Sequence, residues 1–278
     1  IVFSQYQKRR PSGRLFCSNQ AMTTPQFHLL ITGNEQLSGK RQDKHFAKVI
    51  ELFNTRGLAL SQVTFLGDDE ARIASVITAA ARCGDILLCS GGIGATPDDR
   101  TRQACAAALG LAIERHLEAE ALIVAQYGER ARPNRVLMAD FPQGAALIPN
   151  PVNRVSGFSM GDCHFVPGFP EMAWPMIEWV LDTHYAHLHN TAPAVEYLLR
   201  AKGSAAEGDL LDLMEAVLAA HPGLEFSSLP FRGRDDQEPH IEFGFKGAEA
   251  LAASAYRQFE VGLKQRGVRL EPRAAPAD

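Results

Sequence analysis

From residue 27 onward, short apolar runs alternate with longer segments whose apolar residues recur at helical spacing. The runs at residues 27–32, 60–66 and 85–90 have the length of buried strands. The two intervening segments repeat apolar residues at helical intervals, namely Phe46, Val49, Ile50 and Phe53, then Ile73, Val76, Ile77 and Ala80. Strands joined by single helices imply right-handed crossovers and a parallel sheet. The pattern therefore predicts an α/β fold with a mostly parallel sheet.

The pattern continues to about residue 188 and then changes character. After residue 100 the pattern predicts two strands, at residues 145–148 and 163–166. It also predicts three helices, at 103–109, at 114–130 and one that ends at about 188. The tail adds three predicted helices, at 194–200, 209–220 and 248–266, and two strands, at 224–228 and 240–245. We therefore expect an N-terminal extension at residues 1–24, a large domain at 25–190 and a small α+β domain at 191–278.

A glycine-rich stretch follows the third predicted strand and precedes a helix. Its glycines, Gly91, Gly92 and Gly94, allow positive φ and let a ligand approach the backbone closely. Successive bare N–H groups in such a loop, together with the following helix N-terminus, attract anions. With the Ser90 hydroxyl beside them, these residues predict a phosphate site.

Two adjacent carboxylates, Asp98 and Asp99, lie beside this loop, and Thr96 and Thr101 add hydroxyl groups. Carboxylates next to bound phosphates would repel them unless a cation intervenes, and Mg²⁺ is the usual one. The alternative is a tight turn followed by a helix cap, because Asp is favoured at helix starts in any case. The polar loop at residues 33–35 also follows a strand, so both loops should share one edge of the sheet.

Composition narrows the classes of protein. Of 278 residues, 46% are hydrophobic and 22% charged, as in a soluble globular protein. No apolar run reaches membrane-spanning length, and five scattered cysteines without a CxxC pair favour a reducing, cytoplasmic setting. Residues 1–21 hold four basic residues and no acid, which suggests an extension or, alternatively, a targeting peptide. Without them, 24 basic residues face 32 acidic ones, a net charge of −8 that argues against nucleic-acid binding.

Four motifs in this order carry a family resemblance: residues 33–39, residues 90–101, Pro149-Asn150-Pro151 with Gly157-Phe158, and residues 167–172. Together they resemble the MoaB/Mog molybdopterin-binding family, and more closely the N-terminal domain of the competence/damage-inducible CinA proteins. The resemblance covers residues 26–188. It implies a three-layer α/β/α domain, a pocket for a phosphate-bearing pterin or nucleotide, and a homo-oligomer, either a dimer or a trimer. Two tryptophans on one late helix, Trp174 and Trp179, agree with an interface.

The resemblance and the chemistry of the glycine-rich stretch together imply the site residues. Those expected to bind the ligand are Gly33, Asn34, Asp43, Ser90, Gly91, Gly92, Gly94, Thr96, Thr101, Pro167, Gly168, Pro170 and Glu171. Those expected to hold a divalent metal and to act in catalysis are Glu35, Asp98 and Asp99. The chain departs from the CinA pattern in having Asn34 in place of Asp, and Lys44-His45 in place of Thr-Asn. One carboxylate is thus replaced and a cation added.

Two functions of different classes follow from the resemblance. The chain is either an enzyme that hydrolyses the diphosphate link of ADP-ribose-like dinucleotides with Mg²⁺ or another divalent metal, or a protein that binds molybdopterin without hydrolysis. A third reading is an oligomeric scaffold with a vestigial pocket. The tail resembles the short middle module of CinA proteins. Nothing in the chain resembles their Ser/Lys amidohydrolase module, so deamidation of nicotinamide mononucleotide is not predicted.

Overall fold

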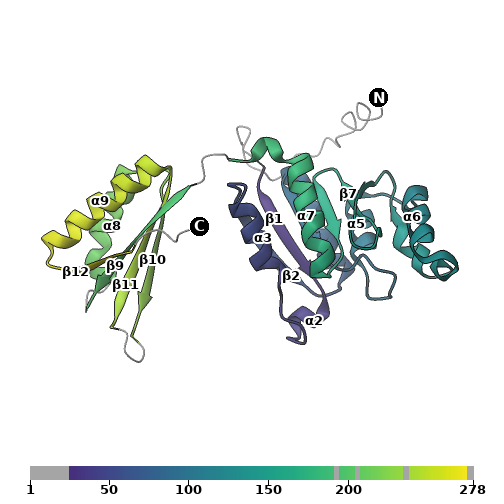
Figure 1. The fold of residues 1–278 in the computed structure, drawn as a ribbon, viewed down its shortest axis with the longest axis horizontal. Helices are drawn as coiled ribbons and strands as arrows, with labels where there is room; N and C mark the ends of the chain where they lie inside the picture. Colours follow the sequence, from purple (N-terminus) through teal and green to yellow (C-terminus); the bar gives the residue numbers. More distant parts are fainter. Residues whose placement is uncertain (1–24, 191–193, 204–206, 234–237, 274–278) are drawn as a thin grey trace. The chain divides into compact units, whose positions relative to one another are not determined.

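The structure is a computed structural model that describes residues 25–190, 194–203, 207–233 and 238–273 (Figure 1). It forms two compact units, divided in the sequence between His189 and Asn190. The predicted extension at residues 1–24 lies outside the described residues. In the part of the chain that the structure describes, no helix is long and apolar enough to cross a membrane.

The first unit is built on a six-stranded sheet in the order β2-β1-β3-β8-β7-β6. Four neighbouring strands run parallel: β2 (Leu60–Leu66), β1 (Phe27–Thr32), β3 (Ile86–Ser90) and β8 (Cys163–Val166). Strands β7 (Gly157–Met160) and β6 (Ala146–Ile148) continue the sheet with antiparallel pairing. The predicted mostly parallel sheet is confirmed, and its parallel part brings four strand ends to one edge.

Helices cover both faces of this sheet. One face carries α3 (His45–Asn54) and α7 (Pro170–His184), and the other carries α4 (Glu70–Cys83), α5 (Thr101–Leu109) and α6 (Leu117–Tyr127) (Figure 1). The alternation of side chains along β1 divides the core in two. Leu29 and Ile31 pack with α3 and α7, while Leu30 packs with α4 on the opposite face. The predicted three-layer α/β/α arrangement is thus confirmed.

The helix predicted at residues 114–130 is present as α6, but its predicted bounds are wrong at both ends. Ile113–Arg115 forms the short strand β4, which pairs antiparallel with β5 (Asp140–Pro142). Helix α6 begins only at Leu117, where the His116 ring accepts a hydrogen bond from the Ala119 N–H at 3.3 Å. A three-residue strand is too short to show a period of two, so the helical periodicity of the following segment masked it.

Smaller corrections concern the ends and faces of helices. The loop predicted at residues 33–39 contains a one-turn helix, α2 (Asn34–Leu37). In α3, Phe46 is 43% exposed and Leu52 is buried, so the apolar face lies slightly away from the predicted one. The helix predicted to reach residue 188 ends at His184, and a separate 3₁₀ turn (Ala186–Leu188) follows.

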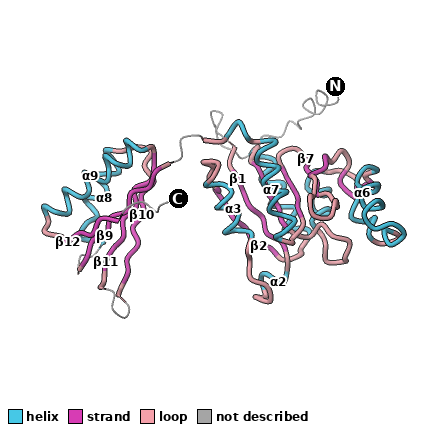
Figure 2. The backbone as a smooth tube through the Cα atoms, viewed as in Figure 1, coloured by secondary structure: helices cyan, strands magenta, loops and turns pink. Residues whose placement is uncertain are grey.

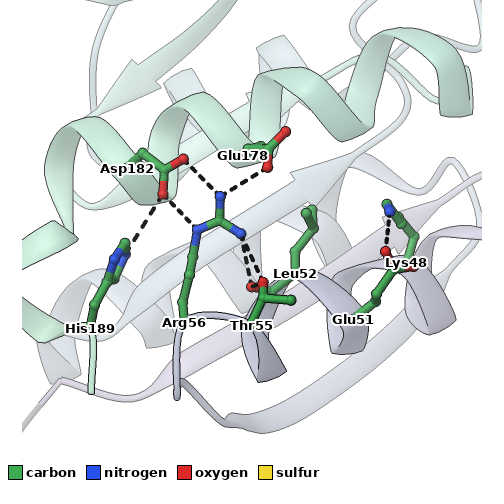
Figure 3. Close-up of polar contacts among 8 residues, drawn as sticks. All are labelled: Lys48, Glu51, Leu52, Thr55, Arg56, Glu178, Asp182 and His189. Atoms are coloured by element: carbon green, nitrogen blue, oxygen red, sulfur yellow. Dashed lines mark hydrogen bonds and ion pairs between the residues drawn. The ribbon is translucent and has the colours of Figure 1, made fainter. Parts of the chain in front are cut away.

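A guanidinium group joins the two helices on the α3 face (Figure 3). The Arg56 side chain, just after α3, donates from Nε to Asp182 Oδ1 at 2.6 Å and from Nη2 to Asp182 Oδ2 at 2.7 Å. It also donates to Glu178 on α7 at 3.0 Å and to the Leu52 carbonyl at 3.0 Å. His189 Nε2 lies 3.9 Å from Asp182 Oδ1. The end of α3 is therefore fixed to the last turns of α7.

The second unit has the order strand-helix-strand-strand-helix-strand. Its elements are β9 (Val195–Lys202), α8 (Leu211–Ala220), preceded by a 3₁₀ turn (Glu207–Leu210), β10 (Glu225–Phe231), β11 (His240–Gly247), α9 (Glu249–Gln265) and β12 (Arg269–Arg273). The strands form one antiparallel sheet in the order β10-β11-β9-β12, and both helices pack on one of its faces (Figure 2). The predicted small α+β unit is confirmed.

The helix predicted at residues 194–200 is wrong, because this segment is β9. Tyr197, Leu199 and Ala201 pack in the core of the second unit, at a spacing of two. Between them, Arg200 pairs with Glu242 at 3.0 Å on the neighbouring strand. The alternation characteristic of a half-buried strand is present, but two adjacent leucines obscure it.

Candidate functional site

A cavity of about 140 Å³ opens at the carboxyl edge of the parallel strands of the first unit. Eight of the predicted site residues line it: Gly33, Glu35, Ser90, Gly91, Gly92, Asp98, Asp99 and Gly168. They come from the loops after β1, β3 and β8, which are neighbours in the sheet. The expectation that the first two loops share one edge is confirmed, and the loop after β8 joins them.

The other eight predicted residues do not line the cavity: Asn34, Asp43, Gly94, Thr96, Thr101, Pro167, Pro170 and Glu171. Asp43 accepts hydrogen bonds from the backbone N–H groups of His45 at 2.9 Å and Phe46 at 3.0 Å. Both of its oxygens thus cap the start of α3. Pro170 and Glu171 form the first turn of α7, where an acidic side chain is favoured at a helix N-terminus.

The turn of the glycine loop requires glycine at two positions. Gly91 has φ 106° and Gly92 has φ 67°. A Cβ at Gly91 would lie 2.5 Å from the Thr32 carbonyl oxygen, and one at Gly92 would lie 2.3 Å from the Thr101 hydroxyl oxygen. Thr101, fully buried, donates from Oγ1 to the Gly91 carbonyl and from its backbone N–H to the Gly92 carbonyl, each at 3.0 Å. The Thr101 hydroxyl therefore holds the loop against the start of α5.

The Ser90 hydroxyl ties the glycine loop to the loop after β8. Its Oγ donates to the Pro167 carbonyl at 3.2 Å and lies 3.4 Å from His45 Nε2. The same His45 nitrogen lies 3.2 Å from the Gly168 carbonyl oxygen. A Cβ on Gly168 would come within 3.4 Å of Gly91 Cα. These contacts bring three loops together at the base of the cavity.

His45 was expected, with Lys44, to add a cation near the site. Its side chain is buried, and burial lowers the pKa of its imidazole, although the Gly168 carbonyl and Asp43 oppose that shift. The neutral ring is therefore favoured at this position. Lys44 is exposed and does not line the cavity. Neither residue supplies the expected charge.

Carboxylates also line the cavity. Asp99 Oδ2 accepts hydrogen bonds from the Thr96 N–H at 2.9 Å and from the Thr96 hydroxyl at 2.6 Å. A Cβ on Gly94 would lie 2.4 Å from the same oxygen, so any larger residue there would displace the Asp99 side chain. Glu35, in the loop after β1, lies with its Oε1 3.9 Å from Arg41 Nη1.

Asp68, in the loop after β2, is a cavity residue that we did not predict as part of the site. Burial raises the pKa of its carboxyl most, the backbone N–H of Asn34 opposes the shift, and Glu35, Asp98 and Asp99 raise it further. The other three carboxylates are therefore close enough to act on the Asp68 carboxyl. The rule that ligands gather at the carboxyl ends of parallel strands also applies to β2, and it would have identified Asp68.

Oxygen ligands of this kind suit Mg²⁺ and similar hard cations. In the described part of the chain, however, no group of three or more His, Cys, Asp or Glu side chains is close enough to hold a metal ion. The carboxylates thus match the chemistry of a divalent cation without forming a preassembled set of ligands.

Comparison with known proteins agrees with this geometry. Residues 28–187 match the family model described as a probable molybdopterin binding domain. The chain belongs to this family. It is 30% identical over 239 residues to a CinA-like protein of Anaeromyxobacter dehalogenans. This match covers 83% of this chain and 57% of that protein. It is 34% identical over 157 residues to a CinA-like protein of Desulfosudis oleivorans. That match covers 54% of this chain and 38% of the relative.

The chain spans about half the length of the curated relatives it matches. Among solved structures, it resembles the protein CinA with unknown function from Thermoplasma acidophilum, with 25% sequence identity and a TM-score of 0.52. That similarity covers 57% of this chain and 98% of the Thermoplasma chain. The predicted resemblance to molybdopterin-binding and CinA-like proteins is confirmed.

Proposed function

We propose that the cavity binds a phosphate-bearing pterin or nucleotide through the backbone of the Gly91–Gly92 turn. The observation that carries this proposal is the pair of positive φ angles, 106° and 67°, in a loop that lines the cavity. A backbone without Cβ atoms, next to the start of α5, is suited to phosphate oxygens. Molybdopterin, named in the family description, is one ligand of this class.

We further propose that a divalent cation, Mg²⁺ or another, accompanies the ligand. Glu35, Asp68, Asp98 and Asp99 would otherwise repel its phosphates. Glu35, Asp98 and Asp99 are the metal-binding and catalytic residues proposed from the sequence. Asp68 is an addition to that set. When bound, such a cation screens phosphate charge and increases the acidity of a coordinated water. The carboxylates would orient the cation, while the glycine turn holds the phosphate to be cleaved.

On this basis the favoured activity is metal-dependent cleavage of a diphosphate link in an ADP-ribose-like dinucleotide. The alternative is molybdopterin binding without hydrolysis. One observation favours the alternative: Asn34 stands where the CinA pattern has Asp, and its side-chain oxygen accepts a hydrogen bond from the Asp68 N–H at 3.3 Å. The set of carboxylates is thus one smaller than the CinA pattern implies.

The test combines binding and turnover. Purified protein is incubated with ADP-ribose and Mg²⁺, Mn²⁺ or Co²⁺, and the release of AMP and ribose 5-phosphate is followed. Calorimetry measures the binding of ADP-ribose and of a pterin diphosphate. Gly92→Val should abolish the binding of both, because the new side chain would meet Thr101 and block the turn.

Gly110→Val is the matched control, since Gly110 has the same φ of 67° and open space around its Cβ position. Binding that survives in Gly92→Val would exclude the glycine turn as the phosphate site. Binding without product release, for every metal tried, would favour the non-hydrolytic alternative.

We also propose that residues 25–190 act as the ligand-binding domain, that residues 191–278 form a separate small domain, and that the protein is a cytoplasmic homo-oligomer without a nucleic-acid partner. Trp174 and Trp179 pack against the core of the first unit, so they lend the oligomer less support than expected. The oligomer then rests on the family resemblance. A monomeric mass by light scattering at micromolar concentration would reject it.

A further inference from the structure

An aromatic ring stands at the rim of the cavity. Phe169 lines the cavity beside Gly168 and is 49% exposed, so part of its ring is free to meet a ligand. Its backbone is fixed, because its carbonyl accepts hydrogen bonds from the N–H groups of Met172 at 3.0 Å and Ala173 at 2.8 Å at the start of α7. The helix start thus holds an exposed ring at the entrance.

Arg41 lies over this ring. Its guanidinium carbon is 5.8 Å from the centroid of Phe169, within the range of a cation–π contact. The Arg41 backbone N–H donates to the Glu35 carbonyl at 3.1 Å, and its Nη1 lies 3.9 Å from Glu35 Oε1. Arg41 therefore stands between the aromatic side of the cavity and its nearest carboxylate.

The cavity has two chemically different sides. The glycine turn and the carboxylates form a polar base, and Phe169 with Arg41 forms a flat, partly apolar rim. Its volume of about 140 Å³ is well below the roughly 300–1,000 Å³ of pockets that enclose a drug-sized ligand. A ligand with two phosphates at the base must therefore extend outward past the rim.

We propose that Phe169, with Arg41 over one face of its ring, stacks the planar heterocycle of the ligand on its other face while the Gly91–Gly92 turn holds the phosphates. This inference rests on the proposed function and names the ligand class more closely, as a diphosphate that carries a flat aromatic ring. Adenine and pterin both have this shape. An aromatic side chain can stack on either heterocycle, since every flat aromatic ring has a π face.

The test separates ring recognition from phosphate recognition. Calorimetry on the full chain with MgCl₂ uses three probes: the α,β-methylene analogue of ADP-ribose, 6-hydroxymethylpterin diphosphate and inorganic pyrophosphate. In Phe169→Ala the affinity for at least one ring-bearing probe should fall about tenfold or more. The affinity for pyrophosphate should stay within about twofold of the wild type. The probe that loses more affinity identifies the ring as adenine or pterin.

Two further variants separate the effect of the aromatic ring from that of a large apolar side chain. Phe169→Trp should restore the affinity for the ring-bearing probe, whereas Phe169→Leu, which is apolar without a π face, should not. Phe65→Ala is the control, because Phe65 is 40% exposed on β2 and does not line the cavity. It should leave all three affinities unchanged. Thermal melting verifies that each variant is folded.

The outcomes distinguish this inference from the proposed function. If wild-type protein binds the ring-bearing probes no better than pyrophosphate, or if Phe169→Ala weakens all three probes equally, the stacking role is wrong and phosphate binding stands. If wild-type protein binds none of the probes, the proposed function fails and the stacking role fails with it.

Discussion

Asn34 and Asp68 are joined by a reciprocal pair of hydrogen bonds. The backbone N–H of Asn34 donates to Asp68 Oδ2 at 3.0 Å, and the backbone N–H of Asp68 donates to Asn34 Oδ1 at 3.3 Å. Gly67 leaves room for the pair, because a Cβ there would lie 2.4 Å from Asn34 Oδ1. The loops after β1 and β2 are thereby joined, and the Asp68 carboxylate is held at the cavity.

This pair predicts that Asn34→Asp increases the affinity for divalent cations. A carboxylate oxygen can accept the same hydrogen bond from Asp68, so the loop should keep its shape. The additional charge beside Glu35 and Asp68 should tighten Mg²⁺ binding by about tenfold, because the affinity of such sites rises with the number of charged ligands. Calorimetric titration with MgCl₂ measures the change.

Asn54→Asp, at an exposed position on α3, controls for the added charge alone. Equal Mg²⁺ affinity in both variants and the wild type would mean that Asn34 does not face a metal site.

Asp99 is predicted to matter for function more than for stability. In Asp99→Asn the side-chain oxygen can still accept from Thr96, so the loop should lose little stability. Loss of one charge near the metal should lower turnover of ADP-ribose, or Mg²⁺-dependent binding if there is no turnover, by about a hundredfold. Glu118→Gln, an exposed position on α6, should be silent in both assays.

Asp98 tests the same idea without the turn. Its carboxyl is exposed, and the Thr96 side chain followed by its own backbone N–H lowers its pKa. Because this carboxyl is exposed, Asp98→Asn should weaken Mg²⁺-dependent binding with at most a small fall in melting temperature. Full activity in both Asp98→Asn and Asp99→Asn would move the proposed metal to Glu35 and Asp68.

The parts of the site that could be predicted are those fixed by local backbone rules. Apolar runs located β1 and β3, and the parallel order placed their following loops at one edge. The role of His45 could not be predicted in this way, because its contact with Gly168 joins residues 123 positions apart. The contact between Arg41 and Phe169 has the same origin, since two loops must fold back before the side chains meet.

A buried relay at the other end of the first unit predicts acid sensitivity. The Tyr185 hydroxyl donates to Asp162 at 3.0 Å, so it accepts from His164 Nε2 at 2.6 Å, and His164 Nδ1 accepts from the Ser159 hydroxyl at 2.8 Å. Burial chiefly, and His184 secondarily, lower the pKa of His164 to about 3. The folded protein therefore resists protonation of this ring, which stays neutral.

The sign follows from proton binding in the two states. Between an unfolded pKa of about 6.5 and a folded pKa of about 3, only the unfolded chain protonates this histidine. The free energy of unfolding should therefore fall with falling pH, by about 1.4 kcal/mol per pH unit from this group below pH 6. The slope is measured by urea unfolding at pH 5, 6 and 7.

His164→Gln should be less stable at pH 7 and should have a shallower slope, whereas His187→Gln, at an exposed position, should keep the wild-type slope. A wild-type slope in His164→Gln would assign the acid sensitivity to other groups, such as the buried His45.

The last prediction concerns the clamp between α3 and α7 (Figure 3). The Arg56 side chain is only 11% exposed, while Asp182 and Glu178 are about half exposed. Removing the buried guanidinium group should therefore destabilise the protein more than removing either carboxylate. Arg56→Ala should reduce the free energy of unfolding by about 2–3 kcal/mol, because it removes several charge-assisted hydrogen bonds. Asp182→Asn should reduce the free energy of unfolding by about 1 kcal/mol or less.

The clamp should also depend on pH. The hydrogen bond from Arg56 lowers the pKa of Asp182, so the stabilisation by the Asp182 carboxylate is present above the unfolded pKa near 3.8 and is lost as the pH falls through the folded pKa. Urea unfolding of both single variants and the double variant at pH 7 and pH 3 gives the coupling between them. A coupling that is present at pH 7 and smaller at pH 3 is expected, and additive effects at pH 7 would mean that the clamp does not stabilise the contact between the two helices.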